Sequence, residues 1–244
     1  MLLKKILGSI RNVDEAYHLI NNHDKIAVGI SGGKDSVLLL YCLDLYRRFS
    51  KKEFSLLGVS IDVGFDNDMS PVLNYFRQRE IEIIIEPTKI KTILEQHLHH
   101  HSIDCSLCSK LKKGALVKIA KENGCSKLAL AHSADDAIET LFLNEIYGGK
   151  IATFQPSQYL SREGLTVIRP LIYTYEDDIR KCCQQLALPI VKSNCPRDGQ
   201  TKRQEMKELL SQIYLEYPAA RRNFLLMLHN EKQFAVWHPN TKQD

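Results

Sequence analysis

The hydrophobic positions of the chain fall into two alternating kinds of segment. Short apolar runs at 25–30, 54–61, 81–85 and 127–131 are rich in Ile, Val and Leu, as is typical of strands buried on both faces of a sheet. A further short run at 166–168 predicts a fifth strand. Between these runs, apolar residues recur with the period of a helix.

Three of the intervening helices have clear boundaries. One covers 35–48, a second starts with the serine cap and first-turn proline at Ser70 and Pro71, and a third covers 134–147 and ends at two glycines. Alternating strands and helices predict an α/β fold with a doubly wound, mainly parallel sheet and crossover helices on both faces.

The same pattern predicts three parts of the chain. An N-terminal helical segment covers 1–24, and the α/β domain covers 25–196. After residue 196 the strand pattern stops, so 197–244 is predicted to be a helical extension rich in Lys, Arg and Glu. Since no Pro/Gly-rich linker interrupts the chain, a single compact domain with helical extensions is the simplest interpretation.

Composition narrows the class of protein. The 244 residues are enough for one large domain, and 44% hydrophobic with 25% charged residues is typical of soluble globular proteins. No apolar run approaches the length of a membrane span, and the N-terminus lacks a signal-peptide core, so we expect a cytoplasmic protein without a membrane partner. The net charge of +4 is compatible with a polyanionic partner but does not require one.

The sequence SGGKDS at 31–36 stands between the first predicted strand and the first long helix. Two glycines at such a junction allow a tight turn and bring backbone N–H groups close to a phosphate, and the helix dipole adds to this attraction. The loop matches neither the Walker A motif nor the G-x-G-x-x-G fingerprint. A serine-capped turn without a ligand is the alternative, but the order of strand, glycines, serines and helix favours a phosphate site.

S-G-G-x-D-S after a first strand resembles the loop of the PP-loop ATP pyrophosphatases. Members of that superfamily bind the pyrophosphate end of ATP in this loop and release pyrophosphate while they transfer AMP to a substrate. The motif does not choose among the synthetases and tRNA-modifying enzymes of the superfamily.

Three of the seven cysteines have spacings that suit a metal centre. Cys105 and Cys108 form a C-x-x-C at the head of a predicted helix, and Cys195 follows a predicted strand at 188–191. Two close thiolates and a distant one can bind a metal centre and leave one coordination position open. A redox pair or half a zinc site explains the C-x-x-C alone equally well. The other cysteines are predicted to be packing residues: Cys42, Cys125, Cys182 and Cys183.

Four segments together resemble the tRNA 2-thiocytidine synthetases: SGGKDS, CSLC with its basic helix, LALAHSADDAIETLFLNEIYGG and VIRPLIY. The resemblance runs from about Asn12 to Pro218. The chain departs from that family in having Cys195 alone where the family carries a second C-x-x-C, and HSADD at 132–136 where the family often reads H-H-x-D-D. It also lacks the zinc-binding cysteine modules of related thiouridine synthetases.

The resemblance implies an ATP-dependent tRNA sulfurtransferase. ATP and Mg²⁺ would bind at the loop, the C2 carbonyl oxygen of a tRNA cytidine, with position 32 as the expected target, would attack the α-phosphate, and pyrophosphate would leave. Sulfide carried on the open iron of a [4Fe–4S] cluster would then displace AMP. A cysteine desulfurase is the expected sulfur source, and we allow for a homodimer.

The resemblance also implies roles for individual residues. The cluster ligands would be Cys105, Cys108 and Cys195. ATP and its magnesium would be bound by Ser31, Gly32, Gly33, Lys34, Asp35, Ser36, Asp62, His132 and Arg169. Asp135, Asp136 and Asp62 would be catalytic groups. From its helical spacing to Cys108, we expect Lys112 to be a further one.

Structural alternatives stay open for several of these residues. Helical spacing puts Lys112 on the face that carries Cys108, so its ammonium group can stabilise negative charge on the substrate, or its stem can cross the apolar face to solvent. Ser133 and Asp136 have the spacing of a capping box, whereas Asp135 needs no capping role there. The basic residues after the cysteines can contact RNA phosphates or lie on ordinary solvated faces.

Three other functions remain as alternatives. Thiolation of another tRNA base, of the 2-thiouridine type, shares the loop and the C-x-x-C. Lysidine-type chemistry would add an amine to the adenylated cytidine and needs no soft metal ligands. A non-catalytic iron–sulfur or zinc protein that senses nucleotide would have no use for the catalytic lysine and aspartates.

Overall fold

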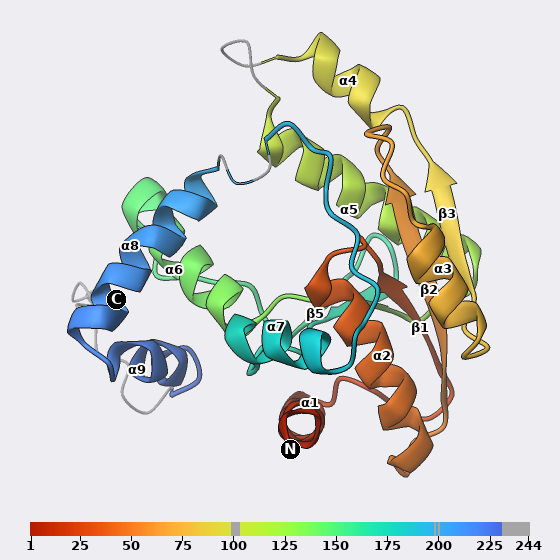
Figure 1. The fold of residues 1–244 in the computed structure, drawn as a ribbon, viewed down its shortest axis with the longest axis horizontal. Coiled ribbons are helices and arrows are strands. Elements are labelled where there is room, and N and C mark those ends of the chain that lie inside the picture. Colours follow the sequence, from red (N-terminus) through yellow and green to blue (C-terminus); the bar gives the residue numbers. More distant parts are fainter. Residues whose placement is uncertain (99–102, 198, 200, 231–244) are drawn as a thin grey trace, which may run out of the picture.

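A six-stranded sheet in the order β3-β2-β1-β4-β6-β5 forms the centre of the computed structural model, which describes residues 1–98, 103–197, 199 and 201–230 (Figure 1). The strands are β1 (Asp24–Gly29), β2 (Phe54–Asp62), β3 (Ile83–Pro87), β4 (Lys127–Ala129), β5 (Ser157–Leu160) and β6 (Leu165–Ile168). Neighbouring strands are parallel except β5 and β6, which form an antiparallel hairpin. The prediction of a doubly wound, mainly parallel sheet is confirmed.

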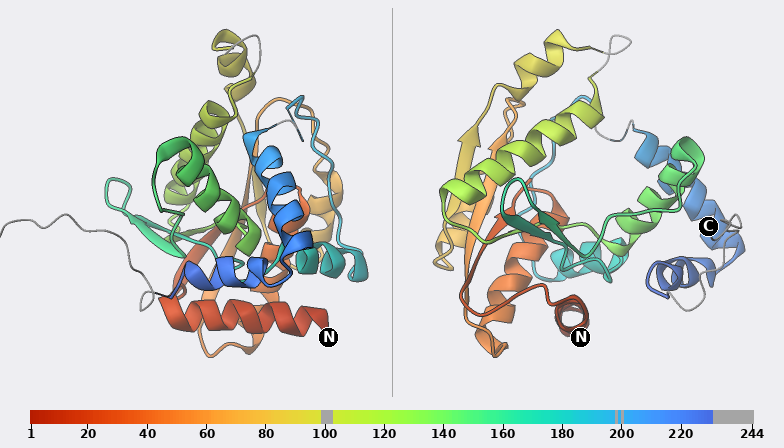
Figure 2. Two further views of the ribbon diagram at one scale, coloured as in Figure 1. Left: turned by 90° about the vertical axis from the view of Figure 1, so that its left-hand side faces the viewer. Right: turned by 180° about the vertical axis from the view of Figure 1, so that it is seen from behind.

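Helices cover both faces of this sheet. They are α1 (Leu2–Tyr17), α2 (Lys34–Phe49), α3 (Ser70–Arg77), α4 (Ile90–Gln96), α5 (Cys105–Glu122), α6 (Ala134–Gly148), α7 (Glu176–Gln185), α8 (Lys202–Glu216) and α9 (Ala220–Met227). Helices α1, α2, α3 and α7 lie on one side of the sheet and α5 on the other, while α8 and α9 pack on α6 beyond the sheet (Figures 1 and 2).

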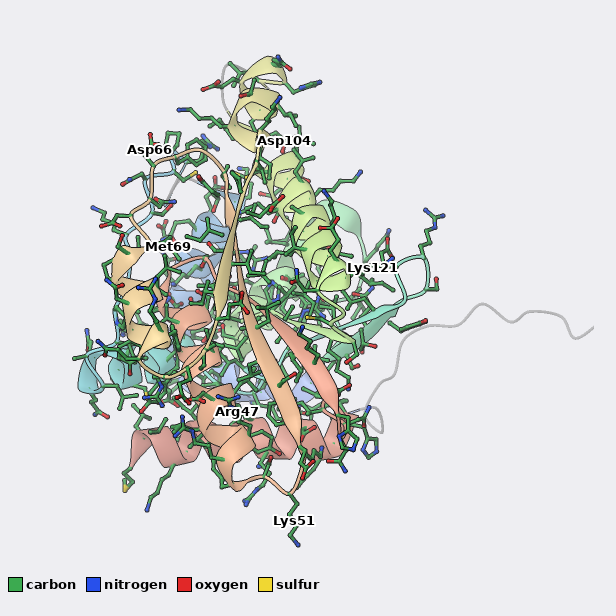
Figure 3. The ribbon with its side chains drawn as sticks, turned by 90° about the vertical axis from the view of Figure 1, so that its right-hand side faces the viewer. Arg47, Lys51, Asp66, Met69, Asp104 and Lys121 are labelled. Carbon is green, nitrogen blue, oxygen red and sulfur yellow. The ribbon has the colours of Figure 1, made fainter. Side chains whose placement is uncertain are left out.

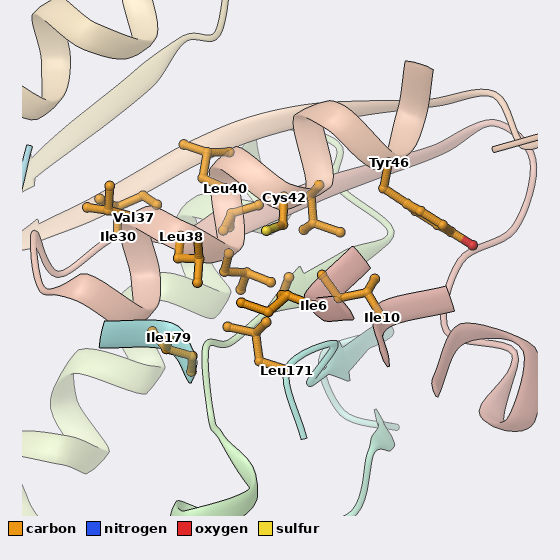
Figure 4. Close-up of a cluster of buried hydrophobic side chains, with 14 of the residues drawn as sticks. Ile6, Ile10, Ile30, Val37, Leu38, Leu40, Cys42, Tyr46, Leu171 and Ile179 are labelled. Atoms are coloured by element: carbon orange, nitrogen blue, oxygen red, sulfur yellow. The ribbon is translucent and has the colours of Figure 1, made fainter. Parts of the chain in front are cut away.

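Two apolar clusters, one on each face, make up most of the core. The larger one joins α1, α2 and α7 to the sheet, with Ile6, Leu38 and Ile179 among its members (Figure 4). The smaller one packs α5 against the other face through Val117 and Ala120. Because the central strands are covered on both sides, their sequences read as continuous apolar runs.

The four cysteines that lack metal-like spacing are buried in these clusters. Cys42, Cys182 and Cys183 belong to the larger cluster and Cys125 to the smaller one. Their prediction as packing residues is confirmed.

The segments at either end of the chain pack onto the α/β domain. Helix α1 contributes Ile6, Ile10 and Val13 to the larger cluster. In the C-terminal part, Met206 and Leu210 of α8 form an apolar cluster with Ile138 of α6. The three-part division at residues 24 and 196 stays a prediction.

The structure differs from the sequence pattern at four places. The hairpin strand β5 and the helices α4 and α7 were not predicted, because β5 is a half-exposed edge strand and the two helices are short. Residues 188–191, predicted as a strand, are irregular. Val191 N–H donates to the Gly32 carbonyl at 2.9 Å, and this contact belongs to no ladder of the sheet.

In the described part of the chain, no helix has the length and apolar character needed to cross a membrane.

Candidate functional site

The SGGKDS loop connects β1 to α2 and exposes the start of that helix. Gly32 has a φ of +83°, and a Cβ added to it would lie 3.0 Å from both Met69 Sδ and Val191 Cβ. Gly33 is the N-cap of α2 and has no side chain with which to cap it. Ser36 Oγ donates to the Gly33 carbonyl at 2.9 Å, which holds the turn closed. The first N–H groups of α2 can therefore bind an anion, as predicted for a phosphate loop.

Two cavities border this loop. The Asp62 cavity, of about 280 Å³, contains Ser31 from the loop and Asp62 from the last position of β2. The cysteine cavity, of about 440 Å³, contains Lys34 and Asp35 from the start of α2. Both lie at the carboxyl ends of parallel strands, where ligands of α/β proteins bind.

Asp35 has one carboxylate oxygen that lacks a partner. Lys34 Nζ donates to Asp35 Oδ2 at 3.1 Å, whereas Asp35 Oδ1 is buried without a hydrogen bond from any described residue. Burial raises the pKa of this carboxyl against the opposing effect of Lys34. An orphaned carboxylate oxygen at the edge of a cavity suits a bound cation or ligand donor.

The C-x-x-C lies in the first turn of α5, on the wall of the cysteine cavity. Asp104 caps this helix, since its side chain accepts from Ser106 N–H at 2.8 Å and from Leu107 N–H at 3.2 Å. Spacing of three residues puts Cys105 and Cys108 on one helix face. Cys108 is buried, and burial raises the pKa of its thiol.

Cys195 reaches the same cavity along the irregular segment after α7. Besides the Val191 bond to the loop, Asn194 N–H donates to Asn67 Oδ1 at 2.9 Å and Asn194 Nδ2 to the Asp66 carbonyl at 3.0 Å. In Figure 1 this segment crosses in front of the start of α2 on its way to α8. Asp66, its anchor, lies at the same end of the molecule as Asp104 (Figure 3).

The three thiols face one cavity but do not form a ready single-ion site. Among the described residues, no group of three His, Cys, Asp or Glu side chains is close enough to hold a metal ion. Sulfur atoms around one zinc ion lie roughly 3.8 Å apart, from the Zn–S distance in a tetrahedron. A larger iron–sulfur cluster needs ligands that are spread more widely, and soft thiolates are the donors that it takes.

Lys112 also lines the cysteine cavity, one turn after Cys108. Its side chain is exposed, so it is not buried with the core residues of α5. The ammonium group can therefore reach a ligand in the cavity.

The two neighbouring aspartates at the start of α6 have different surroundings. Asp136 lines the cysteine cavity, and its Oδ2 accepts from Ser133 N–H at 2.8 Å in the predicted capping box. Asp135 is buried and does not line that cavity. It accepts from Arg221 Nε and Nη2, each at 2.8 Å, and from Glu176 N–H at 2.7 Å. Asp135 thus caps α7, a role that its spacing in the sequence does not reveal.

His132 and Arg169 are hydrogen-bonded to each other, and neither lines the Asp62 cavity or the cysteine cavity. Arg169 Nε donates to His132 Nδ1 at 3.2 Å, and Arg169 Nη1 to the Gln155 carbonyl at 2.6 Å. Burial and the neighbouring guanidinium lower the pKa of His132 to about 4, and burial lowers that of Arg169 to about 10. The imidazole is neutral near pH 7, and its Nδ1 accepts a hydrogen bond from the arginine.

Several cavity residues carry no sequence motif and were missed. Glu176, the first residue of α7, accepts from Lys34 Nζ at 2.9 Å and from Lys207 Nζ at 2.5 Å. Burial opposes ionisation of Glu176, but the two lysines prevail and lower its pKa to about 2. Arg203 Nη1 lies 3.1 Å from Glu139 Oε2, where burial and Asp136 raise the pKa of Glu139 to about 7. Of these residues, only Arg203 was considered in the sequence, as one of the basic residues after Cys195 that can contact RNA.

Comparison with known proteins identifies the family of this chain. The PP-loop domain family matches residues 5–213. A tRNA-cytidine(32) 2-sulfurtransferase of Pelobacter propionicus is 37% identical over 232 residues, which cover 94% of this chain and 86% of that protein. One of Geobacter sulfurreducens is 36% identical over 230 residues, which cover 93% and 90%. The chain belongs to this PP-loop sulfurtransferase family.

Solved structures show the PP-loop fold over the whole chain. The U34-tRNA thiolase of Methanococcus maripaludis, solved with its [4Fe–4S] cluster, superposes with a TM-score of 0.79 at 23% identity, covering 100% of this chain and 84% of that one. An NH3-dependent NAD synthetase of Campylobacter jejuni gives a TM-score of 0.50 at 15% identity, with 97% and 99% covered. At these identities the likeness concerns the fold alone.

Proposed function

We propose that this protein is an ATP-dependent tRNA sulfurtransferase that replaces the C2 oxygen of cytidine 32 with sulfur. The observation that carries the proposal is one cavity that joins Lys34 and Asp35 of the phosphate loop to Cys105, Cys108 and Cys195. An activating nucleotide and a sulfur carrier have to act on the same base, and this cavity borders both. The similarity to tRNA-cytidine(32) 2-sulfurtransferases supports the same chemistry.

The loop would hold ATP across its two cavities. The adenosine would occupy the Asp62 cavity, and the phosphates would lie on the N–H groups of α2 and on Lys34, toward the cysteine cavity. Asp35 Oδ1, which lacks a partner among the described residues, would hold Mg²⁺ against the phosphates. Attack by the C2 carbonyl oxygen on the α-phosphate then releases pyrophosphate and turns that oxygen into a leaving group.

The cavity walls would stabilise the charge that develops during the reaction. Lys112 lines the cavity with an exposed side chain, and its ammonium group would neutralise the negative charge that develops on the departing AMP. Asp136 would orient this lysine or the nucleotide from the opposite wall. We assign a structural role to Asp135, His132 and Arg169. Their hydrogen bonds would hold in place the ends of the strands and helices that carry these groups.

The three thiolates fit a [4Fe–4S] cluster, which when bound would keep one iron open to supply sulfide to C2. The other cysteines are buried in the apolar clusters and are not placed to serve as a fourth ligand. A cysteine desulfurase would provide the sulfur.

The test uses anaerobic protein with reconstituted cluster, ATP, Mg²⁺, sulfide and unmodified tRNA. Nucleoside mass spectrometry should detect 2-thiocytidine, and oligonucleotide mapping should place it at position 32. Cys195→Ala should lose both the thiolation and the iron–sulfur absorbance at about 400 nm, yet still bind ATP. Cys125→Ala, which removes a buried thiol from the smaller core cluster, is the matched control and should keep all three.

Thiolation by Cys195→Ala at the parental rate would show that the cluster is not the sulfur carrier. If sulfur is found only on a uridine, the assignment to cytidine 32 is wrong and the protein is a thiouridine synthetase.

A further inference from the structure

A second hollow lies on the side of α5 that faces away from the cysteine cavity. It has a volume of about 610 Å³ and runs between α5 and the end of β5. We call it the lysine groove, after its four lysines. The residues that line it are Lys110, Lys113, Gly114, Val117, Lys118, Lys121 and Glu122 of α5, with Leu160 and Glu163 opposite.

Four lysines and two glutamates line the lysine groove, so its net charge is positive. Within the described residues, only Lys118 has a carboxylate at ion-pair distance, Glu122 at 3.8 Å. The ammonium groups of Lys110, Lys113 and Lys121 form no ion pair with a described residue. Lys118 has Glu122 at i+4, whereas Lys110, Lys113 and Lys121 have no acidic residue at i±3 or i±4.

Gly114 gives an independent sign that something approaches the helix here. It lies in the interior of α5, where glycine destabilises a helix relative to alanine. A Cβ added to Gly114 would meet no atom within 4 Å, so no described part of the protein requires glycine at this position. What the glycine provides is open backbone between the lysines, which a ligand can approach closely.

Helix α5 connects the lysine groove to the cysteine cavity, because it carries residues that line both. Helix α5 begins at Cys105 in that cavity, and Lys113 lies near enough to His132 to affect its titration. At 1.5 Å per residue, the row from Lys110 to Lys121 is about 16 Å long. A row of unpaired ammonium groups of this length fits several phosphates of one strand.

We propose that the lysine groove binds the ribose-phosphate backbone of the tRNA next to the nucleotide that enters the cysteine cavity. This inference rests on the proposed function, because it specifies where that substrate lies. An acidic protein, such as a sulfur donor, is the competing occupant, and the test separates the two.

The main experiment measures tRNA affinity of the full chain as a function of salt. The variant Lys110→Gln, Lys113→Gln, Lys121→Gln should bind unmodified tRNA at least about ten-fold more weakly near 0.1 M salt. The slope of log K against log[salt] should fall by about 2, because each lost phosphate contact removes about 0.7 to 0.9. ATP binding should not change, since none of these lysines touches the phosphate loop.

The matched control removes the same charge elsewhere. Lys4→Gln, Lys51→Gln, Lys181→Gln changes three exposed lysines on or beside α1, α2 and α7, across the sheet from α5. In Figure 3, Lys51 lies at the bottom edge of the molecule, and Lys121 lies well above it on the right. In this control, the slope of log K against log[salt] should differ from that of the parent by less than about 0.4.

Gly114 supplies a second readout that does not depend on charge. Gly114→Ala should raise the melting temperature, while Gly114→Gln should keep the fold but weaken tRNA binding, because its side chain would occupy the groove. If the triple variant and Gly114→Gln bind tRNA as the parent does, the groove does not bind RNA and the inference is wrong. A parent protein that binds and thiolates no tRNA would instead refute the proposed function.

Discussion

Six consecutive residues form the phosphate loop, whereas the cysteine centre draws two thiols from the start of α5 and one from a segment far along the chain. The loop is held by contacts within itself, such as the Ser36 bond to the Gly33 carbonyl at 2.9 Å. Cys195 is placed by contacts that cross the molecule, from Val191 to Gly32 and from Asn194 to Asp66 and Asn67. One site is therefore local and the other depends on tertiary structure.

These contacts make the position of Cys195 depend on the loop, whereas the loop does not depend on Cys195. The segment that carries Cys195 rests on the loop at Gly32, so damage to the loop can displace the cysteine. Loss of Cys195 leaves the loop bonds in place. The nucleotide site should survive loss of the cysteine centre, and the cysteine centre should be sensitive to the backbone of the loop.

The largest expected effect tests whether the reaction at the loop can be lost while the cysteine centre still assembles. Asp35→Ala should reduce pyrophosphate release at least about 100-fold, because it removes the orphaned carboxylate oxygen proposed to hold the cation. The iron content should match that of the parent, because Asp35 is not a proposed ligand of the cluster. The circular dichroism should also match, because Asp35 lines the cavity and is not part of the apolar core. Pyrophosphate release near the parental rate would remove Asp35 from the ATP site.

A smaller effect tests the contact between the two sites. Gly32→Ala should lower the free energy of unfolding by about 1–3 kcal/mol, because alanine is strained at a φ of +83° and its Cβ would meet Met69 and Val191 at 3.0 Å. The shift of the Val191 segment should also lower iron occupancy. Denaturant titration and iron analysis measure the two effects.

Gly33→Ala is the control for that prediction. A Cβ there would meet only the Ser31 hydroxyl at 3.4 Å, and the φ of −71° suits any residue. It should change stability by less than about 0.5 kcal/mol. Equal iron occupancy in the two variants would mean that Cys195 is positioned independently of the loop.

The smallest effect concerns the ion pairs that tie α7 and α8 to the loop. The pKa of Glu176 is about 2 in the folded protein, below its ordinary value of 4.5. A depressed carboxyl pKa stabilises the fold above pH 4.5, and this contribution is lost as pH falls toward 2. Glu176→Gln should therefore be less stable than the parent by about 1–2 kcal/mol at pH 7, after allowance for solvent around the partly exposed Lys207.

Urea unfolding at several pH values measures this difference. It should shrink as the pH drops from 4.5 to 2, where the parental carboxylate becomes protonated. Glu208→Gln on the exposed side of α8 is the control and should give a small difference at every pH. A stability gap for Glu176→Gln that stays constant down to pH 2 would contradict the ion-pair explanation.

Features with a short-range physical cause could be predicted from the sequence. The central strands follow from apolar runs that must be buried on both faces, and the phosphate loop follows from glycines between a strand and a helix. The C-x-x-C at the first turn of α5 and the capping box of Ser133 and Asp136 also depend on residues three apart. The packing cysteines followed from their lack of any metal-like spacing.

Features that depend on distant partners required the tertiary structure. Nothing near Asp135 in the sequence points to Arg221 and to the start of α7, and nothing near Lys34 points to Glu176 and Lys207. The strand predicted at 188–191 failed for the same reason, since that segment uses its hydrogen bond on Gly32 rather than on a neighbouring strand. Hydrophobic period and local turn chemistry act over a few residues, whereas ion pairs and the approach of Cys195 to the C-x-x-C are fixed only when the sheet and its helices have packed.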